Sequence, residues 1–142
     1  MTIQSGFPVF VVEDNPDDRM AILRELGKIQ PRISLEFCET GSHALEILSA
    51  KKEKGSFFLP KIIILDLKLP GMSGIEFLEC IRSLDDLRSI PVIVLTGSSD
   101  RRDLVSAFNG NVSSYILKPA RIEELRDVLQ KIASFIEICE FI

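Results

Sequence analysis

Residues 61–74 read KIIILDLKLPGMSG, and this stretch decides the fold class. Its first part, Lys61–Leu65, is apolar after the lysine and contains three β-branched isoleucines, which is typical of a strand buried on both faces of a parallel sheet. Asp66 ends this run. Ser73, followed three residues later by Glu76, is the signature of a capping box at the start of a helix. The stretch therefore predicts a strand, a loop that begins with an acid, and a helix.

The same alternation of strand and helix patterns continues on both sides of this stretch. Four more segments have the composition of strands: Pro8–Val12, Ile33–Phe37, Pro91–Leu95 and Tyr115–Leu117. Helical patterns start at Asn15-Pro16, near Ala44, at Ser73, near Arg102 and at Ile122, and the last one extends to about Ile138. The most loop-like stretch is Ala50–Pro60, which is charged and then interrupted by glycine and proline. Five strands alternating with five helices predict an α/β fold with a doubly wound, five-stranded parallel sheet.

Length and composition fit one soluble domain. We expect a single domain over residues 1–142, with its core over about 7–135, because 142 residues is an ordinary length for one domain. A net charge of −4 and a pI near 5.1 argue against nucleic acid or an anionic membrane as the main partner. No apolar run could cross a bilayer, the first ten residues lack a signal peptide, and the three cysteines have no C-x-x-C spacing. These features predict a cytoplasmic protein.

Polar residues follow four of the predicted strands at the points where the strands end. They are Glu13 and Asp14 after the first strand, Asp66 after the third, Thr96 after the fourth and Lys118 after the fifth. Ligands of a doubly wound sheet bind outside the carboxyl ends of the strands, so we expect these side chains to share one site. Converging carboxylates repel each other unless a cation lies between them, and an all-oxygen ligand set favours Mg²⁺. A lysine and a hydroxyl at the same edge can hold the oxygens of a phosphoryl group.

Four motifs, taken in order, make the chain similar to a known family. They are VVEDN at 11–15, ILDLKLPGMSG at 64–74, PVIVLTG at 91–97 and YILKP at 115–119. With these motifs the chain resembles the receiver domain of two-component response regulators over about residues 7–135, which implies the (βα)5 flavodoxin-like receiver fold. It looks most similar to the small single-domain regulators that partner bacterial phytochrome histidine kinases. This finer resemblance rests on residues 15–18, 50–60 and 86–92.

The resemblance implies a phosphoacceptor and a metal site. Asp66 would be the phosphoacceptor, a carboxylate that attacks the phosphoryl group on a phosphohistidine of a sensor histidine kinase. Asp14 would bind Mg²⁺ directly, and Glu13 would hold a metal-bound water. Asp66 would also be a ligand, and the backbone carbonyl of Lys68 would complete the set. The chain would then be a signalling domain that assists its own phosphorylation and dephosphorylation, not an enzyme acting on a separate substrate.

The resemblance also implies a switch. Lys118 would pair with one phosphoryl oxygen, the Thr96 hydroxyl would contact another, and movement of Thr96 would draw Tyr115 inward. The change would reach the surface formed by the last two helices and the fifth strand, to which an unknown downstream protein would bind. The Lys118-Pro119 bond resembles a position where the family has a cis peptide. Residues 109–113, NGNVS, depart from the small-residue pattern that is usual before the fifth strand, so the resting position of Tyr115 stays open.

Other functions fit the same residues less well. A haloacid-dehalogenase-type phosphatase needs a second aspartate two residues after the nucleophile, where this chain has Lys68. A flavodoxin-like FMN carrier needs a Ser/Thr/Gly phosphate-binding loop after the first strand, where this chain has acids that would repel the phosphate: Glu13, Asp14, Asp17 and Asp18. A degenerate receiver that acts as a scaffold is disfavoured because the acids, the threonine and the lysine are all intact. A phosphorelay intermediate stays open as an alternative to a terminal regulator.

The final helix carries two apolar stripes. The first is assigned to the domain core at about 100° per residue: Ile122, Leu125, Leu129, Ile132 and Ile136. The second consists of residues seven apart, with one more alongside: Val128, Phe135 and Ile142, and Ile138. A second stripe must either be exposed or be buried against another chain, so we expect a symmetric homodimer through the last helix and the fifth strand. The alternative is that Val128 and Phe135 only widen the core face.

Overall fold

The computed structural model describes residues 6–29 and 32–140. In this part of the chain, five parallel strands form one sheet in the order β2-β1-β3-β4-β5. The strands are β1 (Phe7–Val12), β2 (Ile33–Cys38), β3 (Ile62–Leu65), β4 (Val92–Thr96) and β5 (Ser114–Leu117). The helices are α1 (Pro16–Leu26), α2 (Gly41–Lys54), α3 (Gly74–Arg82), α4 (Arg101–Asn109) and α5 (Ile122–Ile138), with 3-10 turns η1 (Gly27–Ile29) and η2 (Ser56–Phe58). The doubly wound α/β fold is therefore confirmed.

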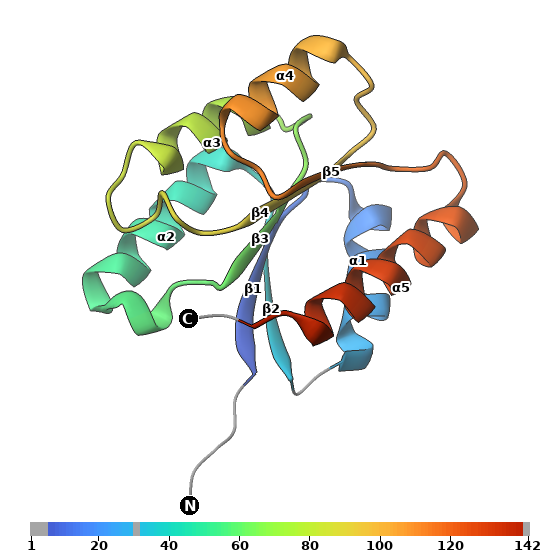
Figure 1. Cartoon of the computed structure of the whole chain (residues 1–142), viewed down its shortest axis with the longest axis horizontal. Helices are drawn as coiled ribbons and strands as arrows, with labels where there is room; N and C mark the ends of the chain where they lie inside the picture. The colour runs from blue at the N-terminus through green and yellow to red at the C-terminus, as the bar shows by residue number, and fades with distance from the viewer. Residues whose placement is uncertain (1–5, 30–31, 141–142) are drawn as a thin grey trace, which may run out of the picture.

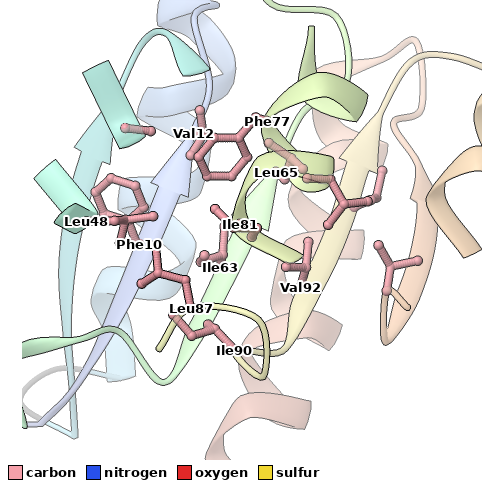
Figure 2. Packing of buried hydrophobic residues seen from close by; sticks show 14 of the residues in the cluster. Phe10, Val12, Leu48, Ile63, Leu65, Phe77, Ile81, Leu87, Ile90 and Val92 are labelled. Carbon is pink, nitrogen blue, oxygen red and sulfur yellow. The ribbon is translucent and has the colours of Figure 1, made fainter. Parts of the chain in front are cut away.

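Helices cover both faces of the sheet, with α1 and α5 on one side and α2, α3 and α4 on the other (Figure 1). Phe10 and Ile63 belong to the buried cluster under α2 and α3, part of which Figure 2 shows. Val11 and Ile64, the residues that follow them, belong to the cluster under α1 and α5. Successive side chains of a strand point to opposite faces, so a strand covered on both faces is apolar throughout. None of the helices in residues 6–29 and 32–140 combines the length and apolarity that crossing a membrane requires.

The order of the strands places the switch point of the sheet between β1 and β3. The chain runs from β1 to its neighbour β2 and then returns on the far side of β1 to form β3. Val12 is aligned with Leu65, and the N–H of Asp66 donates to the Val12 carbonyl at 3.0 Å. The residues that follow β1 and β3 therefore lie side by side at the carboxyl edge of the sheet, where ligands of such folds bind.

The loop expected over Ala50–Pro60 is wrong in its first half. Helix α2 continues through Lys54, and its last turn contains three lysines, Lys51, Lys52 and Lys54. Lysine is a good helix former, and basic side chains near a helix C-terminus interact favourably with its dipole. The helix ends at Gly55, whose φ of 131° suits glycine and few other residues. The charged residues of this stretch therefore belong to the helix, and Gly55 marks its end.

Helix α5 packs much as its sequence predicts. The buried residues of the first stripe are Leu125, Leu129, Ile132 and Ile136. Ile122 is 46% exposed, so its assignment to the core is wrong; it begins the helix about one turn before the first buried residue. In the second stripe, Val128 packs partly against the core, whereas Phe135 and Ile138 are exposed. Ile142 lies outside the described residues.

The contact between α1 and α5 encloses a carboxylate that the apolar patterns did not indicate. Glu25 of α1 is 1% exposed. It accepts hydrogen bonds from Lys28 Nζ at 2.6 Å, Arg126 Nε at 3.2 Å and Gln130 Nε2 at 3.2 Å. The hydrogen bond from Lys28 has the largest effect on the pKa of Glu25. Together with the bonds from Gln130 and Arg126 it outweighs the effect of burial and lowers this pKa to about 2. The buried charge is therefore compensated, and it joins the two helices.

Candidate functional site

Three carboxylates meet at the carboxyl edge of the sheet. Glu13 and Asp14 follow β1, Asp66 follows β3, and one oxygen of each lies within 4.8 Å of the others. Glu13 and Asp66 are buried, and Asp14 is half-buried. Carboxylates this close repel each other without a counter-charge, and such oxygen donors suit a hard divalent cation that keeps some of its water. The donor set therefore fits the magnesium ion expected from the sequence.

Helices α1 and α3 hold the backbone around these acids. Arg19 of α1 donates through Nη1 to the backbone carbonyl of Asp14 at 2.8 Å. At the start of α3, the N–H of Gly74 donates to the Leu67 carbonyl at 2.9 Å. A Cβ at position 74 would lie 2.4 Å from the carbonyl oxygen of Asp66, so only glycine lets α3 approach the Asp66 loop this closely.

Lys118 enters the site from the end of β5. Its backbone N–H donates to the Thr96 carbonyl at 2.8 Å, which continues the pairing of β5 with β4. Its Nζ lies 2.7 Å from Oε1 of Glu13, 2.8 Å from Oδ2 of Asp18 and 2.9 Å from Oδ2 of Asp66. Asp18 was not among the site residues predicted from the sequence. Its position could have indicated this role, because α1 starts directly after the acids that follow β1 and its first turn must lie near the same edge of the sheet.

Burial and the ammonium group of Lys118 act in opposite directions on Asp66 and Glu13. Burial would raise the pKa of Asp66, but the hydrogen bond and charge of Lys118, with further bonds from Thr96 and the Lys68 N–H, hold it below its usual value. Burial raises the pKa of Glu13 to about 7 against the hydrogen bond from Lys118, and the charge of Asp66 adds to the rise. Asp66 is therefore more firmly ionised than Glu13, as a carboxylate nucleophile must be.

Thr96 and Tyr115 are connected through the loop that follows β4. Thr96 is buried at the end of β4, and its hydroxyl is near enough to Asp66 to help lower the pKa of that carboxyl group. Two residues later, the N–H of Ser98 donates to Thr96 Oγ1 at 3.3 Å. The carbonyl of Ser98 accepts a hydrogen bond from the Tyr115 hydroxyl at 2.8 Å, and the ring packs against the core. This answers the question that the sequence left open: in this structure Tyr115 already lies toward the loop after Thr96.

Two expected features of the site remain predictions, and one residue lies outside it. Lys68 contributes its backbone N–H to Asp66 at 3.1 Å, and the ligand role of its carbonyl remains a prediction. The cis form of the Lys118-Pro119 bond also remains a prediction. His43, the single histidine of the chain, is exposed at the start of α2 and is absent from the acidic cluster.

Comparison with known protein families and curated proteins gives consistent matches. The family model described as "Response regulator receiver domain" matches residues 9–130. The chain is similar to the probable methanogenesis regulatory protein FilR2 of Methanothrix harundinacea, with 36% identity over 93% of this chain and 84% of the relative. It is also similar to the response regulator Rcp1 of Synechocystis, with 31% identity over 89% of this chain and 86% of the relative.

Solved structures of similar proteins have the same architecture. The structure of Mn²⁺-bound Rcp1 superposes with a TM-score of 0.88 at 29% identity and covers 96% of this chain and 99% of Rcp1. The structure of the phosphorylated cyanobacterial phytochrome response regulator RcpA has a TM-score of 0.86 at 28% identity, with the same coverage of both chains. Both proteins align over nearly their whole length, so the likeness extends beyond a shared sheet.

Proposed function

Because this chain belongs to the response regulator receiver family, we propose that it is a phosphorylation-controlled switch of a two-component system, with Asp66 as its phosphoacceptor. The observation that carries the assignment is the pairing of Asp66 with Lys118. The carboxylate is buried, its pKa is held below the usual value, and Lys118 Nζ lies 2.9 Å from its Oδ2. A carboxylate that is both buried and charged suits nucleophilic attack on a phosphoryl group.

The proposed transfer is an in-line displacement at phosphorus. A carboxylate oxygen of Asp66 forms the new P–O bond while the P–N bond to the kinase histidine breaks, and the imidazole nitrogen keeps the electron pair and takes a proton from solvent water. Lys118, which already contacts Asp66, and the nearby Thr96 hydroxyl hold phosphoryl oxygens as charge moves onto the new acyl phosphate. The protein thus contributes positioning and charge neutralisation, which is most of what phosphoryl transfer requires.

We assign the metal ion to Mg²⁺. Asp14 and Asp66 would bind it directly, Glu13 would hold one of its waters, and the carbonyl of Lys68 would complete the protein ligands. When bound, the ion neutralises charge on the phosphoryl oxygens. All-oxygen donors and the solvent access left by the half-buried Asp14 support a small, well-hydrated cation. The relative Rcp1 was crystallised with Mn²⁺, which takes the same kind of ligands.

The phosphodonor would be a sensor histidine kinase, and the similarity to RcpA supports a kinase of the phytochrome type. FilR2, which is more similar in sequence, is described as a probable regulator of methanogenesis, so a kinase with another sensor is the alternative. Rates of phosphotransfer from the purified histidine kinases of the host would separate the two. A phytochrome kinase that transfers no faster than unrelated kinases would exclude the first.

The proposed output surface is the face formed by α4, β5 and α5, and the proposed homodimer would use β5 and α5. Strand β5 pairs only with β4 in the described sheet, so its outer edge is free for another chain. A cavity of about 290 Å³ opens beside this strand, lined by residues that include Ile116, Val128 and Phe135. Phe135 and Ile138 are 49% and 77% exposed. Exposed apolar side chains around a free strand edge support a symmetric homodimer or the docking of a downstream protein here.

One substitution tests the phosphoacceptor. Asp66→Asn keeps the size of the side chain but cannot form an acyl phosphate, so it should abolish base-labile labelling by acetyl phosphate or a phosphorylated kinase. Labelling would be quantified by mass spectrometry. The matched control is the variant Asp86→Asn, which makes the same change at an exposed aspartate. Full labelling of the Asp66→Asn protein would refute the assignment.

A further inference from the structure

The ammonium group of Lys118 has a different carboxylate for each of its three N–H donors. Its Nζ lies 2.7 Å from Glu13, 2.8 Å from Asp18 and 2.9 Å from Asp66. A lysine ammonium has three donors and no acceptor, so these contacts use its whole hydrogen-bonding capacity. The side chain of Lys118 is only 11% exposed, which leaves little room for water to replace a lost partner.

The three partners are not equivalent with respect to a metal ion. Glu13 and Asp66 belong, with Asp14, to the group whose oxygens lie within 4.8 Å of one another, and Asp18 does not. A divalent cation among the first three acids competes with the ammonium for the charge of Glu13 and Asp66, because both groups are positive and are attracted to the same carboxylates. Asp18 is therefore the partner of Lys118 that does not also bind the cation.

Asp18 is also held by a rigid element. It lies in the first turn of α1, and its backbone N–H donates to Oδ1 of the N-cap residue Asn15 at 3.0 Å. This cap forms through the backbone of residue 18, so it does not depend on the side chain there. The backbone of Asp18 is therefore fixed, and its carboxylate contacts Lys118 from a defined position.

We propose that Asp18 is a positioning residue that retains the Lys118 ammonium when the metal ion and the phosphoryl group occupy Glu13 and Asp66. One N–H of Lys118 stays on Asp18, and another is then directed at a phosphoryl oxygen. This inference rests on the proposed function. Without the carboxylate of Asp18, the long lysine side chain loses the one contact that both states share, and its charge is no longer placed reproducibly at the phosphoryl group.

The neighbouring residue Asp17 provides a matched control. It carries the same charge in the same first turn of α1, but it is exposed, and Lys118 forms no ion pair with it in the described structure. Effects of net charge or of the helix dipole should therefore be similar for Asp17→Ala and Asp18→Ala. A difference between the two variants reports the contact with Lys118.

The test compares both variants with the wild type in the presence of Mg²⁺. The first readout is the ¹⁵N NMR signal of the Lys118 ammonium in the beryllofluoride complex, identified by its loss in Lys118→Arg. We expect the signal in the wild type and in Asp17→Ala, and its loss through fast exchange in Asp18→Ala. The second readout is the initial rate of Asp66 labelling by acetyl phosphate, which should fall about tenfold in Asp18→Ala and less than twofold in Asp17→Ala.

The outcomes separate this inference from the proposed function. If the wild type is labelled and Asp18→Ala matches Asp17→Ala in both signal and rate, the role of Asp18 is refuted and the proposed function stands. If the wild type itself is not labelled at Asp66, both are refuted. Asp18→Asn keeps an acceptor and the shape of the side chain; it should give an intermediate rate, and it replaces the alanine variant if circular dichroism finds that variant unfolded.

Discussion

The hydroxyl of Tyr115 donates a 2.8 Å hydrogen bond to the backbone carbonyl of Ser98. Ser98 follows Thr96 by two residues, and its own N–H contacts the Thr96 hydroxyl oxygen. The ring on β5 is therefore tied to the loop between β4 and α4 that leads away from the phosphoacceptor. A displacement of Thr96 toward a phosphoryl group would therefore move Ser98 and, through it, the hydrogen-bonded Tyr115.

Tyrosine fluorescence should report this connection, because the chain has one tyrosine and no tryptophan. Mg²⁺ with beryllofluoride should change the emission of the wild type. Lys118→Ala should stay folded but give no change, since it lacks one of the contacts that draw the phosphoryl group and Thr96 together. A wild type that binds beryllofluoride with unchanged emission would contradict the switch.

Metal binding should depend on Asp14. We expect Mg²⁺ to bind in the millimolar range, roughly −4 kcal/mol, because few protein ligands hold it and most of its water remains. Asp14→Ala should weaken binding at least tenfold, measured by isothermal titration, because it removes a direct ligand. His43→Ala, an exposed substitution outside the acidic cluster, should bind as the wild type does. Equal affinities of the wild type and Asp14→Ala would locate the ion elsewhere.

The proposed homodimer predicts a specific pattern in sedimentation. At tens of micromolar, Phe135→Glu and Ile138→Glu should be monomeric, because a charge on the apolar stripe of α5 cannot be buried against a second copy. Phe57→Glu is the control, since Phe57 is 81% exposed but lies in η2, outside α5 and β5. A wild type that is monomeric with and without beryllofluoride, or a Phe57→Glu protein that alone dissociates, would rule out this interface.

Arg82 should be a major source of stability. Its guanidinium donates to the carbonyls of Gly110 at 2.7 Å, Ile90 at 2.8 Å, Arg88 at 2.9 Å and Asn111 at 3.3 Å, which joins the loops before β4 and before β5. Arg82→Met should lower the free energy of unfolding in urea by about 2–4 kcal/mol, because partly buried carbonyls lose a charged donor.

The control for Arg82 is Arg102→Met. The Arg102 side chain is 91% exposed, and its ion pair with Asp100 at 3.0 Å is surrounded by solvent, so its loss should change the free energy of unfolding much less than the loss of Arg82. Similar losses in the two variants would mean that the carbonyl contacts of Arg82 contribute little to stability.

Glu25 should make the free energy of unfolding decrease as the pH falls below about 4.5. Its pKa is about 2 in the folded chain against an ordinary value of 4.5, so its contribution is complete above about pH 4.5 and is lost as the pH falls toward 2. Glu25→Gln should be less stable by about 2 kcal/mol at pH 7, and its unfolding free energy should fall less steeply below pH 4.5. Urea titrations over pH 2.5–7 would measure both slopes, with the exposed Glu46→Gln as control. Parallel slopes for Glu25→Gln and the wild type would contradict this role.

Local sequence was sufficient for the architecture and for most of the site. The unbroken apolar runs identified strands covered on both faces, because only such strands can be apolar throughout. The position of Asp66 at the end of β3 then implied proximity to Glu13 and Asp14, since parallel strands end at one edge. These inferences depend only on strand periodicity and on the topology rule, so no side-chain detail was needed.

Contacts between segments far apart in the chain were decided only by the tertiary structure. Asp18 and Lys118 are 100 residues apart, and Glu25 and Arg126 are 101 apart. A sequence pattern indicates which face of a helix is apolar, but not which polar side chain on that face meets a partner from another element. The position of the Tyr115 ring was also decided by the tertiary structure, because its hydroxyl donates to the carbonyl of Ser98 in the loop after β4. The sequence by itself determined the sheet and the residues at its edge, through periodicity; the packing of α1, β5 and α5 around that edge decided which of their charges pair.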